Sequence, residues 1–227
     1  MKIAASKPIR FTVNEIAGKV SGLLRAPRGA NALLALAHGA GAGMRHHFME
    51  DVADKFAGLG IATLRYQFLY MEKGIKRPDN EALLTATVRA ALAAAREQGP
   101  DLPLFAGGKS MGGRMTSIAA ANGSLEGVRG LVFFGFPLHA AGRPGAERGK
   151  HLFNVRAPML FLQGSRDSLA DLRLLEPVCK GLGKKAELFV VEGGDHSFHM
   201  LKSSGRSDDQ VLDEIVSKAA AWMRGLA

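Results

Sequence analysis

Short apolar segments alternate with longer amphipathic segments along most of this chain, and this alternation limits the possible folds more than any other feature. Ala32–Ala37 (ALLALA) contains only apolar residues, which is typical of a strand buried on both faces. Asp79–Gln98 is rich in alanine, has helical periodicity and is followed by the helix-ending pair Gly99-Pro100. Strands that alternate with helices form a mostly parallel sheet covered by helices on both faces. We therefore predict a doubly wound α/β fold.

The remaining elements follow from run length, periodicity and the positions of glycine and proline. Further strands are predicted at Ile61–Arg65, Pro103–Ala106, Gly130–Phe134, Pro158–Gln163 and Glu187–Val191. Further helices are predicted at His46–Leu59, Gly112–Ala121, Leu169–Gly181 and Asp208–Arg224. Ile9–Val13 alternates and is expected to form an edge hairpin with Gly18–Leu24. The length of 227 residues suits a single domain over 1–227, with a short lid-like loop at 138–157.

The stretch LFAGGKSMGGRM, residues 104–115, fits two kinds of catalytic loop. Its Gly-Lys-Ser triplet suggests a phosphate-binding loop, but the first glycine of that motif would fall on Pro103. Proline has no N–H to offer a phosphate, and its φ is fixed. The same stretch contains G-x-S-x-G, and Gly108 and Gly112 supply the small residues that a nucleophile elbow needs around Ser110. We therefore predict that Ser110 is a nucleophile.

Two further catalytic candidates follow predicted strands, as Ser110 does. Asp167 comes after the strand that ends at Gln163, and His196 comes after the strand that ends at Val191. Ligands of such sheets bind at the carboxyl ends of the strands, and Ser, Asp, His is the chain order of an α/β-hydrolase triad. Serine needs a histidine to take its proton, and the imidazole needs a carboxylate to fix its tautomer. The predicted triad is Ser110, Asp167 and His196.

An acyl-transfer site also needs N–H groups that bind the developing oxyanion. Met111 follows the nucleophile and is predicted to supply one donor. Ala40, in the loop after the strand Ala32–Ala37, is predicted to supply the second, with Gly41 as the alternative. The residues predicted to contact the substrate are Gly39, Gly41, Tyr70 and Arg114.

Neighbouring histidines and aspartates have other interpretations. Asp167 also suits a helix cap, and Asp195 competes with it as the acid, although adjacency to His196 keeps Asp195 from the ring across a tight turn. His199 lies three residues after His196, but no third ligand has suitable spacing, so no metal site is predicted. No cofactor is expected. The ring of His38 is predicted to hold loop geometry.

The net charge of +9 is high, but the basic residues are scattered and no nucleic-acid-reading motif accompanies them. No nucleic-acid partner is predicted. Arg114 either pairs with a neighbouring loop carboxylate or recognises a substrate carboxylate or phosphate. The lid-like loop carries Arg143, Arg148, Lys150 and Arg156. These residues predict a shallow pocket with a basic rim and a preference for small, soluble, anionic acyl esters or thioesters.

The only cysteine is Cys179, so no intrachain disulfide can form. No apolar run has the length of a membrane span, and the stretch MKIAASKPIRFTV lacks the apolar centre of a secretory signal. We therefore expect a cytoplasmic protein with no membrane partner. The sequence leaves the oligomeric state open.

Several segments together resemble one group within the α/β-hydrolase superfamily: HGAGAGM, RYQFLYMEKGIKRPD, GGKSMGGRM, GFPLH, QGSRD and GGDHSF. The group is similar to dienelactone hydrolases, and it includes bacterial proteins, a testis-expressed animal protein and a domain of a chromatin acetyltransferase complex subunit. The resemblance covers residues 30–225 and implies a compact, nearly lidless α/β-hydrolase fold. By motif match it also implies the triad Ser110, Asp167 and His196.

The chain departs from that pattern in two loops. Ser168 follows Asp167 where proline is common, and Gln67-Phe68-Leu69 stands where Asn-Phe-Pro is expected. Both changes alter loop stiffness and leave the catalytic groups in place. Dienelactone hydrolases proper use a cysteine nucleophile, so their specific activity is not implied. The predicted function is a serine carboxylesterase or thioesterase; the alternatives are a catalytically weak scaffold or binding protein and an aminopeptidase-like hydrolase.

Overall fold

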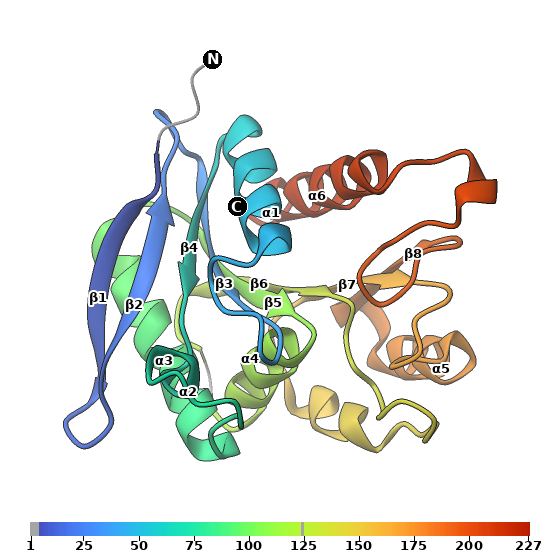
Figure 1. Ribbon diagram of the computed structural model, residues 1–227, viewed down its shortest axis with the longest axis horizontal. Helices are drawn as coiled ribbons and strands as arrows, with labels where there is room; N and C mark the ends of the chain where they lie inside the picture. The colour runs from blue at the N-terminus through green and yellow to red at the C-terminus, as the bar shows by residue number, and fades with distance from the viewer. Residues whose placement is uncertain (1–4, 124) are drawn as a thin grey trace.

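The computed structural model describes residues 5–123 and 125–227 and contains one open sheet (Figure 1). Its eight strands lie in the order β1-β2-β4-β3-β5-β6-β7-β8. The strands are β1 Lys7–Asn14, β2 Gly18–Arg25, β3 Ala32–Ala37, β4 Ile61–Tyr66, β5 Leu104–Lys109, β6 Val128–Phe134, β7 Met159–Gly164 and β8 Ala186–Val191. Strands β3 to β8 pair in parallel, while β1 and β2 form an antiparallel hairpin at one edge.

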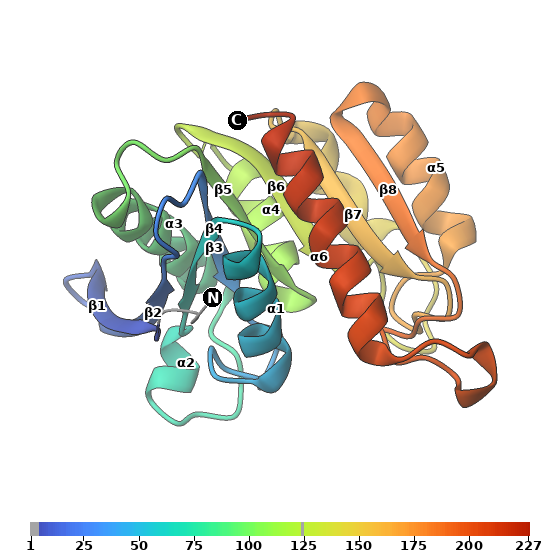
Figure 2. The same ribbon diagram turned by 90° about the horizontal axis from the view of Figure 1, so that it is seen from above.

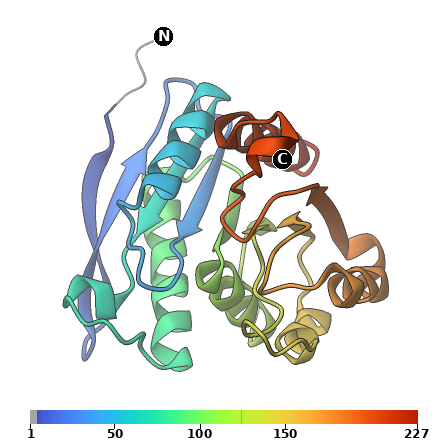
Figure 3. The same ribbon diagram turned by 45° about the vertical axis from the view of Figure 1, so that its right-hand side comes forward.

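Helices cover both faces of the sheet (Figures 1 and 2). The helices are α1 His47–Gly58, α2 Leu69–Glu72, α3 Glu81–Gln98, α4 Met111–Ala121, α5 Leu172–Leu182 and α6 Asp208–Arg224, with 3-10 turns η1 Glu147–Asn154, η2 Gly183–Lys185 and η3 Lys202–Ser204. Helices α1 and α6 lie side by side on one face, and α3, α4 and α5 cover the other (Figure 3). Within the described residues, no helix is both long enough and apolar enough to cross a membrane.

The apolar strands are buried on both faces, which is why their sequences are almost continuously hydrophobic. In β3, Leu33 and Ala35 pack in the core under α3 and α4, while Leu34 and Leu36 pack in the core under α1 and α6. Full burial of one leucine side chain stabilises a fold by about 1.5–3 kcal/mol. The alternation between two cores therefore fixes the register of each central strand.

The structure confirms the predicted doubly wound, mostly parallel sheet, including the edge hairpin of β1 and β2. The prediction places the start of α5 at Leu169, three residues before its first residue, Leu172. The reason is local: the side chain of Asp171, and not that of Asp167, accepts a hydrogen bond from the N–H of Arg173 and caps the helix. Helix α2 has no counterpart among the predicted elements. The same is true of the turn η1, which lies inside the loop 138–157.

Candidate active site

Ser110 occupies a strained turn between β5 and α4. Its backbone has φ 50° and ψ −117°, a conformation that residues other than glycine rarely adopt. The flanking glycines make this turn possible, since a Cβ on Gly108 would lie 2.5 Å from the carbonyl oxygen of Ala37, and one on Gly112 would lie equally close to it. The close approach of β3, β5 and α4 therefore excludes any side chain at these positions, and it raises Ser110 above the carboxyl edge of the sheet.

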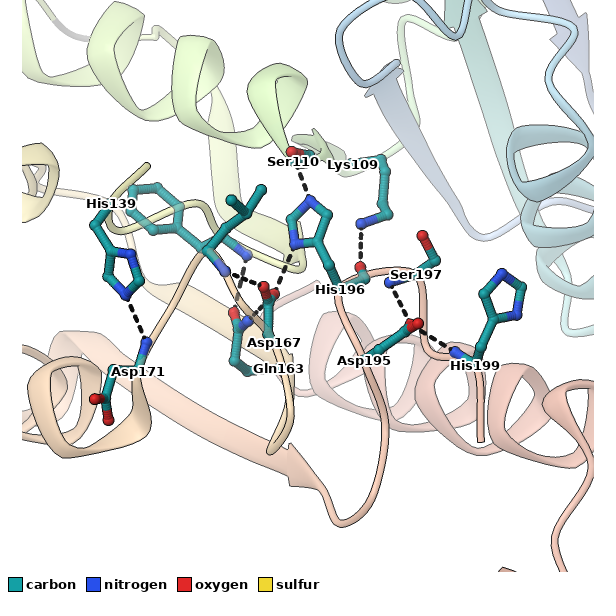
Figure 4. Close-up of polar contacts among 12 residues, drawn as sticks. Lys109, Ser110, His139, Gln163, Asp167, Asp171, Asp195, His196, Ser197 and His199 are labelled. Atoms are coloured by element: carbon teal, nitrogen blue, oxygen red, sulfur yellow. Dashed lines mark hydrogen bonds and ion pairs between the residues drawn. The ribbon is translucent and has the colours of Figure 1, made fainter. Parts of the chain in front are cut away.

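Three side chains from three different strand ends meet at this edge (Figure 4). The Oγ of Ser110 lies 2.8 Å from Nε2 of His196, and Nδ1 of His196 lies 2.7 Å from Oδ2 of Asp167. The Asp167 side chain is fully buried, and 22% of the His196 side chain is exposed. In the tautomer that this pairing favours, Nδ1 donates to the carboxylate and Nε2 accepts from the hydroxyl.

The carboxylate of Asp167 is held by donors other than the histidine. The amide Nε2 of Gln163 donates to Oδ2 over 2.5 Å, and the N–H of Leu169 donates to Oδ1 over 2.7 Å. Gln163 is itself fixed, because its Oε1 accepts from the N–H of Phe136. Sequence reasoning assigned no role to Gln163, although the residue begins the QGSRD segment.

The loop after β3 is held in place by two aromatic side chains. His38 donates from Nδ1 to the carbonyl of Gly39 over 2.7 Å, while its Nε2 accepts from the N–H of Phe68. Burial lowers the pKa of His38 to about 4, so the ring stays neutral. The hydroxyl of Tyr70 accepts from the N–H of Gly41 over 2.9 Å. Both rings therefore hold the backbone of the loop, as predicted for His38. Tyr70 and Gly41 are predicted to contact the substrate; in the structure they form a hydrogen bond with each other.

The loop after β3 runs close to Ser110. A Cβ on Gly39 would lie 3.7 Å from the Cβ of Ser110. Among the described residues, no hydrogen bond uses the N–H of Ala40 or of Met111. These two donors remain available to an oxyanion, and Met111 begins α4, whose N-terminal dipole favours negative charge.

A cavity of about 700 Å³ opens beside Ser110 and His196. Gly39 and Ala40 line it, together with Phe48 and Met49 of α1 and Leu212 of α6. The polar part of the lining comes from His46, His47, Asp51, Lys109, Ser197, His199, Asp208 and Asp209. Apolar walls and a mixed polar margin surround Ser110, so the cavity suits a small ligand of moderate polarity.

The predicted basic residues do not line this cavity. Arg114 points to the start of α3, with its Nη2 3.9 Å from Oε2 of Glu81. Arg148 donates to the carbonyl of His139 over 3.1 Å. The lining also omits Tyr70 and the basic side chains of the loop 138–157. In place of the predicted basic rim, the cavity margin carries histidines and carboxylates.

The other acid and histidine near the site have separate partners. Asp195 accepts hydrogen bonds from the N–H groups of Ser197 and His199, which closes the turn around His196. His199 lies 2.7 Å from Oδ2 of Asp208 through its Nδ1. The geometry therefore places Asp167, and not Asp195, on the His196 ring.

Lys109 is a buried residue of the site that the sequence analysis leaves without a role. Its ammonium donates to the carbonyl oxygen of His196 over 2.5 Å, and its side chain lines the cavity. The G-x-S-x-G motif contains Lys109 as a variable position, so the motif itself carries no signal for this contact.

Comparisons with known proteins agree with this architecture. The sequence model of a family described as an alpha/beta hydrolase domain matches residues 30–224. A dienelactone hydrolase from Anabaena variabilis has a TM-score of 0.75 at 21% identity, with 97% of each chain covered. A serine hydrolase without a lid from Xanthomonas campestris has a TM-score of 0.73 at 20% identity, with 96% of this chain and 95% of that one covered. At these identities the likeness concerns the fold.

A curated relative has a different kind of name. A Mycobacterium tuberculosis protein provisionally named a phosphoribosyl transferase is 29% identical over 226 residues. The match covers 96% of this chain and 47% of that protein, so this chain spans about half the length of the curated relatives it matches. The transferase name therefore does not say which half of the longer protein it describes.

Proposed function

Because this chain belongs to the alpha/beta hydrolase domain family, we propose that it is a serine hydrolase that cleaves small carboxylic esters or thioesters. One observation carries the proposal: the His196 ring lies between Ser110 and Asp167, 2.8 Å from the hydroxyl and 2.7 Å from the carboxylate. That arrangement is the one in which a histidine can take the proton of an otherwise weak nucleophile.

The proposed reaction has two stages. Ser110 Oγ attacks the acyl carbon while its proton passes to Nε2 of His196, and the N–H groups of Met111 and Ala40 bind the oxyanion. The carbon–oxygen or carbon–sulfur bond then breaks, and His196 returns the proton to the leaving alkoxide or thiolate. Water next attacks the acyl carbon and gives a proton to His196, which passes it to Ser110 Oγ as the acyl–oxygen bond breaks and the carboxylic acid leaves. Asp167 stabilises the imidazolium in both stages.

The cavity favours small acyl groups without a net negative charge. Its walls are apolar where Phe48, Met49 and Leu212 meet, and its margin carries the carboxylates of Asp51, Asp208 and Asp209. Asp208 and Asp209 have His199 and Lys55 as partners, and Lys109 also lines the cavity, so the lining presents no excess of positive charge. The arginines that suggested an anionic substrate lie outside the lining, and the proposed substrates are therefore neutral esters.

A panel of small chromogenic substrates tests the proposal. We expect turnover of p-nitrophenyl acetate, butyrate and a matched thioester, with little turnover of an aminoacyl p-nitroanilide. Ser110→Ala should abolish all of it, because no hydroxyl remains to form the acyl-enzyme. Turnover that survives Ser110→Ala, or an amide cleaved faster than its matched ester, would refute the proposal. A folded wild type that cleaves none of the substrates would favour the scaffold alternative.

A further inference from the structure

Lys109 is buried beside the nucleophile in surroundings that do not neutralise it. The residue is 9% exposed and follows the last apolar positions of β5. Among the described residues, its ammonium forms no salt bridge; it donates to one backbone carbonyl, that of His196. Burying a cation without an ion partner costs free energy, and a hydrophobic side chain of similar size would avoid that cost. A role in function would explain why a lysine occupies this position.

Two aromatic rings complete the surroundings of the ammonium. Nζ of Lys109 lies 5.7 Å from the centroid of the Phe48 ring and 5.6 Å from that of Phe198, within the range of cation–π attraction. The two rings stack, with centroids 6.1 Å apart and planes inclined by 13°. Phe48 belongs to α1, and Phe198 follows His196 by two residues. Lys109 therefore contacts both α1 and the loop 195–199, and it connects them to the nucleophile elbow.

The backbone around this contact is adapted to it. Phe198 has φ 66°, one of the few positive values outside glycine, so its ring is aimed by a strained backbone. Gly135, the first residue after β6, has φ 67°, and a Cβ there would lie 3.0 Å from both Nζ of Lys109 and the carbonyl oxygen of His196. A larger residue at position 135 would enter the contact itself.

We propose that Lys109 is a positioning residue that holds the loop 195–199 against the nucleophile elbow, and thereby sets the distance between His196 and Ser110. The proposal rests on the proposed hydrolase function for its activity readouts and on geometry for its structural ones. The backbone carbonyl that Lys109 holds belongs to the same residue whose ring must take the serine proton. A displacement of about 1 Å at such a site can cost about 10²-fold in rate.

The charge of Lys109 gives the proposal a pH signature. Burial lowers its pKa to about 8, while the carboxylates of Asp167 and Asp195 act in the opposite direction. The other titratable groups that face it are His196 and His46. The pKa of His46 is lowered by burial, by His47 and by this ammonium. Its usual pKa is 10.5, so a loop that opens and exposes the amine binds the proton more tightly than the closed loop does. Deprotonation therefore favours the closed loop, in which the amine can still donate to the His196 carbonyl, and the contact should tighten as the pH rises through about 8.

The test compares wild type with Lys109→Met and Lys109→Arg on p-nitrophenyl butyrate between pH 6 and 10. Lys109→Met should lower kcat about 10- to 100-fold at pH 7 and leave KM within about threefold. Wild-type kcat should rise as the pH passes through about 8, and this alkaline limb should be missing from both variants. Lys109→Arg, which keeps a permanent charge, should recover part of kcat. Lys218→Met is the matched control, because Lys218 also lies over a phenylalanine ring, 5.7 Å from the centroid of Phe189, and does not line the cavity.

Hydrogen–deuterium exchange supplies a readout that needs no turnover. In Lys109→Met, the amides of residues 195–199 should exchange at least about tenfold faster than in wild type, while Lys218→Met leaves them unchanged. Unaltered kcat, an alkaline limb that persists in Lys109→Met, or unaltered exchange would overturn the inference. If Lys109→Met fails to fold, Lys109→Arg decides, since a limb retained there contradicts the proposal. If wild type itself shows no turnover, the proposed function fails, while the exchange result still tests whether Lys109 holds the loop 195–199.

Discussion

The two sides of Ser110 differ in what their charged residues do. On the cavity side, formed by α1, α6 and the loop 195–199, the buried Lys109 donates to the carbonyl of His196 and lines an open space. On the arginine side, formed by α3, α4 and η1, Arg114 approaches Glu81 and Arg148 donates to a backbone carbonyl. The number of basic residues suggested the arginine side as the binding face, but the cavity lies on the other.

The difference shows that partners and burial, and not charge alone, identify a functional residue. His151 on the arginine side lies 2.7 Å from the hydroxyl of Ser117, which ties η1 to α4. Burial, followed by the nearby Arg114, lowers the pKa of His151 to about 4. The contact between His151 and Ser117 therefore fixes the loop 138–157 to α4. On the cavity side, by contrast, polar side chains line an open space.

The comparison between two aspartates on the cavity side should give the largest effect. Asp167→Asn keeps the shape but presents an amide to the His196 ring, which disfavours the tautomer that accepts the serine proton. We expect kcat to fall about 10³- to 10⁴-fold. Asp195→Asn should lower kcat less than about tenfold, because its carboxylate holds only the turn at Ser197 and His199. Steady-state kinetics on one ester measures both; equal losses would contradict the assignment of Asp167.

Glycine substitutions test the packing on which both sides depend. A Cβ on Gly112 would lie 2.5 Å from the carbonyl oxygen of Ala37, so Gly112→Ala must displace backbone. We expect the free energy of unfolding to fall by at least about 3 kcal/mol in urea titrations. Gly58→Ala, in α1, is the matched control, because no atom lies within 4 Å of its added Cβ. Its stability should be unchanged or rise by up to about 1 kcal/mol.

His38 and His151, whose pKa values are both lowered, provide a pH test of the two sides. The pKa of His38 is lowered from 6.5 to about 4, so between these values the unfolded chain binds a proton that the folded chain does not. Stability from this group is therefore present above pH 6.5 and lost as the pH falls to 4, by about 3 kcal/mol. His38→Gln should flatten this part of the stability curve.

His151→Gln is the counterpart on the arginine side. The pKa of His151 shifts in the same direction, but solvent reaches the ring more easily, so the flattening should be smaller. Urea titrations of wild type and both variants at pH 7, 5.5 and 4.5 measure the difference. A larger effect at His151 than at His38 would reverse the account of which ring is more deeply buried.

The smallest effect is expected at Arg114. Its guanidinium lies outside the cavity lining, so Arg114→Gln should change kcat/KM by less than about threefold for both a neutral ester and its anionic counterpart. Steady-state kinetics on p-nitrophenyl butyrate and its terminal-carboxylate analogue makes the comparison. A selective loss with the anionic ester would restore Arg114 to substrate recognition.

Much of the architecture could be predicted because each central strand carries its own signal. The run ALLALA matches β3 at both ends, since continuous burial and flanking polar residues bound it sharply. Helix α6 also matches at both ends, because Ser207 and Gln210 form a capping box. The turn η1 could not be predicted from the sequence, because its residues are mostly polar and only a few side chains, such as Leu152, reach the core.

Part of the candidate site could likewise be predicted from the sequence, and part of it could not. Ser110, Asp167 and His196 follow strands that the sequence identifies, and parallel pairing brings those strand ends to one edge. The contact between Lys109 and the His196 carbonyl joins residues 87 positions apart, and it depends on loop backbone angles that no short motif encodes. The position of Arg114 depends likewise on how α3 packs against α4. Tertiary contacts of this kind require the structure.

The most direct test of the central claim is the intact mass of the protein after treatment with a fluorophosphonate probe. Wild type and Ser110→Ala would be treated side by side, and circular dichroism would establish that both are folded. We expect one stoichiometric adduct on wild type and none on Ser110→Ala. A folded wild type that takes up no probe, or an adduct that persists in Ser110→Ala, would contradict the assignment of Ser110 as an activated nucleophile.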